Sequence, residues 1–184
     1  MGPSGVGKSV ILKKLKARHP EFIFPRSATT REKRKGEGGD LYHFVTDAAF
    51  DVLITESKLL EWAVVHGGAR YGTVLEEIIP HIEQGKTVIR EVDVQGFDSI
   101  RTSRQFRSPG AAYRLQSIFI FPENRSQLIA RITHRAPITS EELERRIASM
   151  DRELTYAHLC DHQIVNHDRK IQETIAEVEK VIAA

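Results

Sequence analysis

The 184-residue sequence predicts one α/β domain in which a mainly parallel sheet carries helices on both faces. Short apolar runs of strand length alternate along the chain with longer amphipathic runs of helical spacing, a pattern typical of βαβ units. The length also suits one core, because a chain of about 150 residues buries roughly 70% of its unfolded surface on folding. We find no internal repeat, low-complexity tract or linker, so the sequence predicts a single unit.

Composition excludes several classes of protein. A hydrophobic fraction of 40% and a charged fraction of 28% exclude a disordered chain. No apolar run approaches the ~18 residues of a membrane span, and a net charge of +2 is small for a nucleic-acid-binding protein. Cys160 is the only cysteine, so an intramolecular disulfide is impossible and a reducing compartment fits. We therefore expect a cytoplasmic protein with neither nucleic acid nor a membrane as partner.

The chain opens on the pattern G-x-x-x-x-G-K-[ST], the phosphate-binding P-loop. Its glycines allow backbone N–H groups to point at phosphate oxygens, its lysine places a cation on the β- and γ-phosphates, and its serine hydroxyl can bind Mg²⁺. Apolar residues of helical spacing follow from Val10 to Leu15, so the phosphates would lie at a helix N-terminus. The predicted ATP-binding residues are Gly2, Pro3, Ser4, Gly5, Val6, Gly7, Lys8 and Ser9.

A P-loop normally follows a buried strand, whereas here only Met1 precedes the motif. Either a first strand is missing from the chain or the sheet lacks a central member. We expect a missing first strand, because a gap in the sheet would leave backbone donors on both neighbouring strands unpaired.

The remaining elements follow in order. Strands are predicted at residues 22–24, 42–45, 63–65, 87–94, 117–121 and 163–165. Helices are predicted at residues 46–60, 74–84, 126–132, 141–156 and 170–182. Thr46 or Asp47 caps the first of these helices, Gly85 ends the second, and Thr139 begins a capping box for the fourth. The polar, glycine-containing run between residues 26 and 40 is predicted to be irregular.

Two carboxylates in the run 87–94 are candidates for organising Mg²⁺ through bound water. With the two-residue period of a strand, Glu91 and Asp93 point to the same face. The alternative is a solvated edge strand with scattered charges, which the apolar residues around them disfavour. Arg90 is the awkward member of this strand, because its side chain would point to a face that a helix covers.

Seven ordered blocks together resemble guanylate kinases over nearly the whole chain. After the P-loop they are Ser27-x-Thr29-Thr30-Arg31-x-x-Arg34-x-Gly36-Glu37, Tyr42-x-Phe44-Val45, Leu60-Glu61-Trp62-Ala63, Tyr71-Gly72-Thr73, Asp93-Val94-Gln95-Gly96 and Ile164-Val165-Asn166. The resemblance implies transfer of the ATP γ-phosphoryl group to GMP with Mg²⁺, giving ADP and GDP. This sequence departs from the family at Arg90, which stands where the family has an apolar residue.

The resemblance also implies an organisation. The fold would be a P-loop NTPase fold with a small GMP-binding subdomain and a helical lid. The core would comprise residues 1–25, 75–122 and 157–184, with a GMP-binding segment at 26–74 and the lid at 123–156. ATP and GMP would be the partners of a monomer or weak homodimer.

Site residues are implied by the matching positions. Arg31, Arg34, Tyr42 and Tyr71 would hold the GMP phosphate, and Glu37 would belong to the same site. Glu61 and Asp93 would accept hydrogen bonds from guanine, while Ser27 and Thr73 would donate to its keto oxygen. Lys8 and the lid arginines Arg131, Arg135 and Arg146 would neutralise charge on the transferred group, and Asn166 would contact the adenine edge. No general base is required, because the acceptor phosphate is already an anion.

Other interpretations remain open at this stage. A binding module for a phosphorylated peptide would need no Lys8, and a kinase for another phosphorylated small molecule would need no Glu61. The basic run 31–35 on its own could bind RNA or direct nuclear import. The cluster His158, Cys160, Asp161, His162 and His167 contains enough ligand types for a metal, although an ordinary loop with a buried cysteine is the simpler interpretation.

Overall fold

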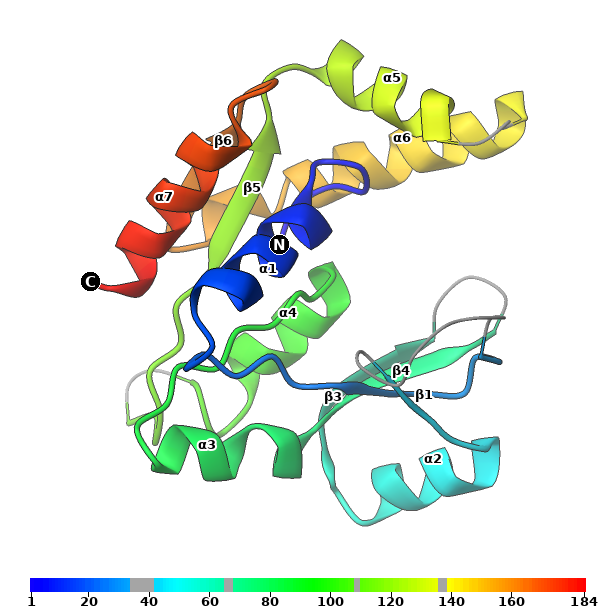
Figure 1. Ribbon diagram of the computed structural model, residues 1–184. Coiled ribbons are helices and arrows are strands. Elements are labelled where there is room, and N and C mark those ends of the chain that lie inside the picture. Colours follow the sequence, from blue (N-terminus) through cyan, green and yellow to red (C-terminus); the bar gives the residue numbers. More distant parts are fainter. Residues whose placement is uncertain (34–41, 65–67, 108–109, 136–138) are drawn as a thin grey trace. The chain divides into compact units, whose positions relative to one another are not determined.

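The structure is a computed structural model that describes residues 1–33, 42–64, 68–107, 110–135 and 139–184; of residues 134 and 135 it describes the backbone (Figure 1). The chain divides into two compact units. Unit 1 comprises residues 1–19 and 116–184, and unit 2 comprises residues 20–115. Each unit is described by itself.

Unit 1 is built on two parallel strands, β5 (Ile118–Pro122) and β6 (His162–Asn166). Met1 lies along the other edge of β5, where its ammonium donates to the Ile118 carbonyl at 2.7 Å and its carbonyl accepts from the Ile120 amide at 2.9 Å. Those two bonds have the spacing of a parallel pair. The P-loop therefore starts directly beside β5.

Helices complete unit 1. They are α1 (Lys8–Arg18), α5 (Arg125–Arg135), α6 (Ser140–Leu154), the 3₁₀ turn η2 (Ala157–Leu159) and α7 (Ile171–Ile182). Helix α1 packs against α7, which also contacts β6. Thr139 caps α6 by accepting from the Glu142 amide at 3.2 Å, which confirms the predicted cap.

Unit 2 contains a four-stranded sheet. Its strands are β1 (Ser27–Thr29), β2 (Tyr42–Phe44), β3 (Leu59–Val64) and β4 (Arg70–Val74), in the order β2-β1-β4-β3. Strands β1 and β2 are parallel, whereas β4 runs antiparallel to both β1 and β3. The prediction of a mainly parallel sheet is wrong for this sheet, because the sequence pattern does not reveal strand direction.

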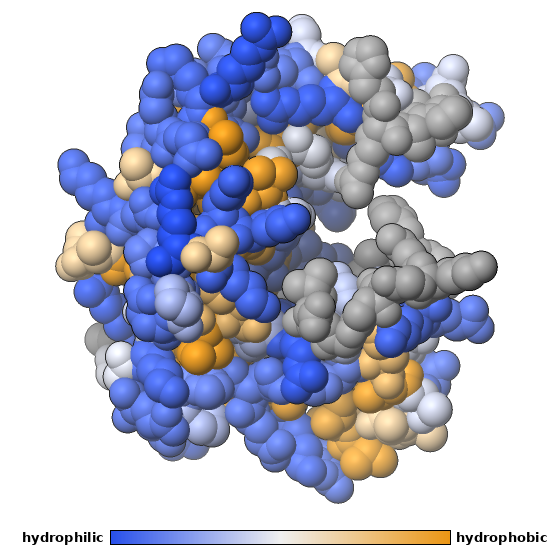
Figure 2. Space-filling view, in the orientation of Figure 1, coloured by the Kyte–Doolittle hydropathy of each residue, from blue (hydrophilic) through white to orange (hydrophobic). Residues whose placement is uncertain are grey.

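The helical elements of unit 2 are α2 (Asp47–Thr55), the 3₁₀ turn η1 (Leu75–Glu77), α3 (Ile79–Glu83) and α4 (Val94–Thr102). Thr46 caps α2 by accepting from the Ala49 amide at 3.2 Å. Apolar residues gather at the end of unit 2 that carries α2 (Figure 2). Among them, the exposed fraction is 48% for Val52 on α2 and 44% for Trp62 on β3.

Several predicted elements need correction in extent. The helix predicted at 46–60 ends at Thr55, because Ser57 takes a left-handed conformation (φ 53°) from which the chain enters β3. That strand begins at Leu59, four residues before the predicted strand 63–65. The helix predicted at 74–84 is divided into η1 and α3 around Ile78, whose ψ of −60° and φ of −122° depart from helical values.

The largest error lies at residues 87–94. This segment is not a strand: within the described part of the chain its one sheet-like pairing is a parallel bridge between Ile23 and Val88, and α4 starts at Val94. The strand predicted at 22–24 is the other side of the same bridge. The β-branched and alternating residues of the run 87–94 resemble a strand, but Asp93 caps the helix that follows and ends the extended run. Strands β1 and β4 and helix α4 are elements that the sequence analysis missed.

Among the described helices, none is long and apolar enough to cross a membrane.

Candidate nucleotide sites

The P-loop of unit 1 has the backbone that the motif predicts. Gly5 and Gly7 both have positive φ, 85° and 108°, and the chain enters α1 immediately afterwards. A side chain at Gly7 would approach within 2.7 Å of the Asn166 Nδ2 atom, and one at Gly2 would collide with the Ile120 carbonyl. Glycine is therefore required at Gly2 and Gly7 both by conformation and by space, and at Gly5 by conformation.

Lys8 and Ser9 begin α1. The Lys8 ammonium donates to the carbonyls of Gly2 at 2.6 Å and Pro3 at 3.1 Å, so it lies across the start of the loop. Ser9 is exposed in the first turn, at the end of the helix where the dipole favours anions. The cation and the hydroxyl that the motif requires are thus both at the helix N-terminus.

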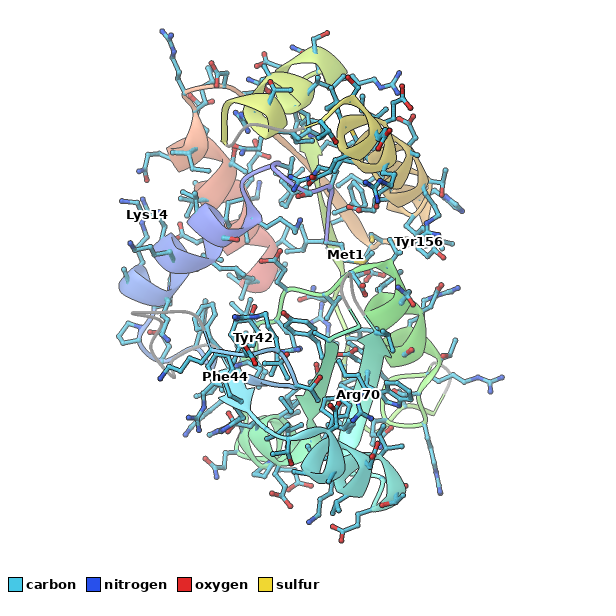
Figure 3. The ribbon with its side chains drawn as sticks, turned by 90° about the vertical axis from the view of Figure 1, so that its right-hand side faces the viewer. Met1, Lys14, Tyr42, Phe44, Arg70 and Tyr156 are labelled. Atoms are coloured by element: carbon cyan, nitrogen blue, oxygen red, sulfur yellow. The ribbon has the colours of Figure 1, made fainter. Side chains whose placement is uncertain are left out.

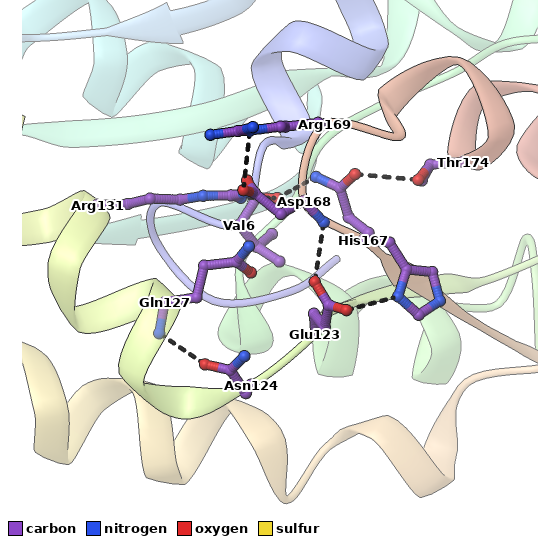
Figure 4. Close-up of polar contacts among 10 residues, drawn as sticks. Val6, Glu123, Asn124, Gln127, Arg131, His167, Asp168, Arg169 and Thr174 are labelled. Atoms are coloured by element: carbon purple, nitrogen blue, oxygen red, sulfur yellow. Dashed lines mark hydrogen bonds and ion pairs between the residues drawn. The ribbon is translucent and has the colours of Figure 1, made fainter.

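Asn166, at the end of β6, holds the P-loop through a hydrogen bond to its backbone. Its side chain is buried; Nδ2 donates to the Val6 carbonyl at 2.7 Å, and Oδ1 accepts from the Thr174 hydroxyl at 3.0 Å (Figure 4). Both ends of the amide are therefore used in holding the loop to β6 and α7. The predicted contact of Asn166 with adenine stays a prediction.

The structure places Arg131 of α5 beside the loop. Its guanidinium is 3.2 Å from the Asp168 carboxylate and 3.5 Å from the Val6 carbonyl (Figure 4). Asp168 is itself positioned by Glu123, which accepts from the Asp168 amide at 3.0 Å and pairs with His167 at 3.4 Å. The backbone bond from Asp168, with a further contribution from His167, lowers the pKa of Glu123.

The other two predicted lid arginines differ from Arg131. Arg146 is exposed on α6 and pairs with Glu142, one turn earlier on the same helix, at 2.6 Å. The side chain of Arg135 lies outside the described part of the chain. Of the predicted lid arginines whose side chains the structure describes, Arg131 is the one that lies beside the P-loop.

In unit 2, four predicted GMP-site residues stand in one row across the sheet. Ser27 on β1 is directly opposite Tyr42 on β2 and Thr73 on β4, and Thr73 is directly opposite Glu61 on β3. Directly opposed residues of neighbouring strands point to the same face of a sheet. We call Tyr42, Ser27, Thr73 and Glu61 the cross-strand row.

Hydrogen bonds link the members of this row. The Thr73 hydroxyl donates to Oε1 of Glu61, whose side chain is only 8% exposed. Arg90 reaches the row from the segment before α4: its guanidinium donates to the Ser27 hydroxyl at 2.8 Å and lies 3.7 Å from Oε1 of Glu61. Burial lowers the pKa of Arg90, and the charge of Glu61 opposes that shift.

Next to the row are the groups predicted for the GMP phosphate. Nε of Arg31 donates to the Tyr71 hydroxyl at 3.0 Å, and the Arg31 guanidinium lies over the ring of Tyr42, 5.3 Å from its centre. The rings of Tyr42 and Tyr71 meet edge to face at 5.7 Å. Figure 3 shows Tyr42 and Phe44 on the same short strand. The predicted residues Arg34 and Glu37 lie outside the described part of the chain.

Asp93 and Glu61 converge at Gly96. Oδ1 of Asp93 accepts from the Gly96 amide at 2.8 Å, as the cap of α4. A Cβ on Gly96 would lie 3.1 Å from Oε2 of Glu61 and 3.4 Å from Oδ1 of Asp93. The absence of a side chain at Gly96 therefore lets α4 approach both carboxylates.

The prediction that Glu91 and Asp93 share one face of a strand is wrong. Residues 87–93 form no strand beyond the bridge at Val88, and Asp93 is a helix cap. The expectation for the Arg90 side chain assumed that strand; in the structure Arg90 contacts Ser27 and Glu61. Two signals in the sequence could have indicated these roles: the single basic residue in the run 87–94, and an Asp-x-x-Gly pattern before a helix.

The cluster around Cys160 is not a metal centre in the described residues, which contain no group of three or more His, Cys, Asp or Glu side chains able to hold an ion. Cys160 is buried, as the simpler interpretation predicted, and burial raises the pKa of its thiol. Its Sγ atom lies 3.9 Å from the sulfur of Met1.

Comparison with known proteins shows the family of this chain. The family model described as guanylate kinase matches residues 1–184, the whole chain. The chain belongs to the guanylate kinase family. A guanylate kinase of Thermosynechococcus vestitus is 38% identical over 182 residues, covering 98% of this chain and 90% of that protein. One of Thermobifida fusca is 37% identical over 184 residues, covering 100% and 88%.

A solved structure shows the fold. The crystal structure of guanylate kinase from Anaplasma phagocytophilum matches with a TM-score of 0.70 and 23% identity, covering 99% of this chain and 81% of that one. Membership of the guanylate kinase family confirms the predicted α/β P-loop NTPase fold and the predicted class of enzyme, a nucleoside monophosphate kinase.

Proposed function

We propose that this guanylate kinase transfers the γ-phosphoryl group of ATP to GMP, giving ADP and GDP, with ATP bound by unit 1 and GMP by unit 2. The observation that carries the assignment of the acceptor is the cross-strand row. In it, a buried carboxylate and two hydroxyls, from three different strands, stand directly opposite one another.

The row has the hydrogen-bonding pattern that guanine requires. The Glu61 carboxylate accepts from the ring N–H and the exocyclic amine of guanine, with Asp93 as a second acceptor near Gly96. Ser27 and Thr73 would donate to the keto oxygen, and Thr73 would turn its hydroxyl proton away from Glu61 to do so. Adenine has no donor at the ring position and an amine in place of the keto group, so it would leave a buried carboxylate unpaired.

The GMP phosphate would bind where Arg31, Tyr42 and Tyr71 already contact one another. A forked guanidinium and two phenol hydroxyls suit a dianionic phosphate. We propose Arg34 and Glu37, from the same segment of the sequence, as further members of this site.

On the donor side, residues 2–9 would hold the ATP phosphates through the glycine-rich backbone, Lys8 and the N-terminus of α1. Asn166 would act by fixing the Val6 carbonyl. Arg131 would neutralise charge on the transferred group, with Arg135 and Arg146 in the same role and residues 123–156 as the lid that excludes water.

The residues present fit Mg²⁺, because Ser9 places a hydroxyl oxygen at the helix N-terminus and Mg²⁺ takes oxygen ligands. The described residues contain no group of three or more His, Cys, Asp or Glu side chains that would hold the ion alone, so Ser9 would share it with phosphate oxygens. When bound, Mg²⁺ neutralises phosphate charge. Catalysis by the chain's own residues then rests on positioning and charge, with no general base.

A coupled assay of ADP release with ATP, Mg²⁺ and one acceptor at a time tests this proposal. We expect release with GMP and little with AMP or a sugar phosphate. Release with another acceptor and none with GMP would assign a different substrate. Tight GMP binding without any ADP release would favour the non-catalytic binding module.

A further inference from the structure

Arg90 is a largely buried cation that contacts two members of the cross-strand row. Its side chain is 16% exposed, and its terminal nitrogen lies 2.8 Å from the Ser27 hydroxyl and 3.7 Å from the Glu61 carboxylate. Its Nε atom is buried and has no hydrogen-bond partner among the described residues. Burying a charge costs folding free energy unless the charge is paired, so an arginine is unusual at a position with so little exposure.

The hydrogen bonds within the row and from Arg90 determine which hydroxyl can donate a proton to a ligand. Thr73 already gives its only hydroxyl proton to Glu61, and so that proton is not available to a ligand in this arrangement. Ser27 accepts a hydrogen bond from Arg90, and its own proton is therefore left to point elsewhere. An accepted hydrogen bond from a charged group also strengthens the accepting hydroxyl as a donor.

Arg90 also contacts Glu61, which lies on the other side of Thr73 from Ser27. Its terminal nitrogen is 3.7 Å from Oε1 of this carboxylate, whose side chain is 8% exposed, and the attraction between the two charges holds the carboxylate in place. A carboxylate offers acceptors only, whereas adenine needs a donor at its ring nitrogen.

We propose that Arg90 is a positioning residue that determines base specificity, by holding the Glu61 carboxylate in place as an acceptor and leaving the Ser27 hydroxyl as a donor, on the two sides of Thr73. This inference rests on the proposed function, because the row must bind the base of the acceptor nucleotide. With Glu61 and Ser27 set in this way, the row matches a ring N–H and amine on one side and a keto oxygen on the other, which is guanine and not adenine.

Steady-state kinetics of Arg90→Leu and Arg90→Lys with GMP and AMP test the proposal. For Arg90→Leu we expect KM for GMP to rise about tenfold or more with a smaller change in kcat, as one charged hydrogen bond lost from a buried site predicts. KM for AMP should not rise in parallel, so the GMP/AMP ratio of kcat/KM falls by about the same factor. Arg90→Lys should restore part of that ratio.

Arg101→Leu is the matched control, because Arg101 is an exposed arginine on α4 that pairs with Asp98. It should leave the GMP/AMP ratio of the wild type unchanged. Thermal unfolding is measured for each variant. If Arg90→Leu does not fold, Arg90→Gln, which keeps a side-chain donor but loses the charge, replaces it and should also lower the ratio.

A double-mutant cycle with Ser27→Ala separates positioning from a general effect on structure. If Arg90 acts through Ser27, Arg90→Leu costs less GMP affinity in the Ser27→Ala background than in the wild type. Additive losses, or an unchanged GMP/AMP ratio in folded Arg90→Leu, would overturn the inference. A wild-type protein that does not phosphorylate GMP would overturn the proposed function itself.

Discussion

The two proposed nucleotide sites of this molecule are built in different ways. The P-loop of unit 1 consists of eight consecutive residues, and its conformation depends on glycine backbone angles and the start of α1. The cross-strand row of unit 2 consists of single residues from four strands, and it exists only because of strand register. A phosphate site made of backbone is local, whereas a base-reading site made of side chains requires a correctly paired sheet.

The comparison predicts that damage to the two sites separates ATP effects from GMP effects. The largest effect is expected for Lys8→Ala, because it removes the cation from the P-loop. We expect kcat to fall about a hundredfold or more, with GMP affinity nearly unchanged. A fixed-time assay of ADP release measures kcat, and calorimetric titration with GMP measures the affinity.

Lys14→Ala is the control for that variant, since Lys14 is an exposed lysine further along α1. It should behave as the wild type. Undiminished turnover in Lys8→Ala would contradict the assigned role of Lys8.

Glu61→Gln should break the row while leaving the P-loop intact. The amide replaces one acceptor by a donor, so guanine loses a partner and the side chain's bond from Thr73 is altered. We expect KM for GMP to rise about tenfold to a hundredfold and discrimination against AMP to relax, with KM for ATP unchanged. Glu76→Gln, at an exposed glutamate in η1, is the control. Unchanged discrimination in Glu61→Gln would place the base elsewhere.

Asn166→Ala tests the support of the P-loop from β6. It removes a buried side chain that bonds both Val6 and Thr174, so the free energy of unfolding should fall by about 1–3 kcal/mol. KM for ATP should rise while KM for GMP does not. Thr174→Val, which removes only the outer of the two bonds, should have a smaller effect on both quantities. Equal rises of KM for both nucleotides would contradict a local role.

Gly96→Ala is expected to have the smallest effect and sharpens the comparison. The added Cβ would lie 3.1 Å from Glu61 Oε2, so the carboxylate must shift by a few tenths of an ångström. We expect a severalfold rise in KM for GMP, while alanine stabilises the helix by up to about 1 kcal/mol. Affinity and thermal stability would then move in opposite directions, whereas a merely misfolded variant would lose both.

More of the P-loop than of the cross-strand row could be predicted from the sequence. The P-loop, its glycines and the helix after it follow from consecutive residues, and the caps at Thr46 and Thr139 were recognisable for the same reason. In contrast, β1 and β4 are short and contain polar or glycine residues, so no periodicity marks them as strands. The residues of the row were predicted from family resemblance, but their direct opposition could be seen only in the register.

Arg90 shows why the rest could not be predicted. Periodicity along residues 87–94 predicts a strand, and a strand would turn Arg90 away from Glu61. The helix that starts after Asp93 replaces that geometry and allows the guanidinium to reach Ser27. Long-range contacts of this kind depend on where neighbouring elements end, and element boundaries are the least certain part of a sequence pattern.

A crystal structure of the protein with GMP tests the central claim most directly. The account predicts that the guanine edge lies within hydrogen-bond distance of Glu61 and Ser27, and that the phosphate is bound by Arg31, Tyr42 and Tyr71. GMP bound away from β1, β3 and β4, with the cross-strand row making no contact to the base, would contradict it.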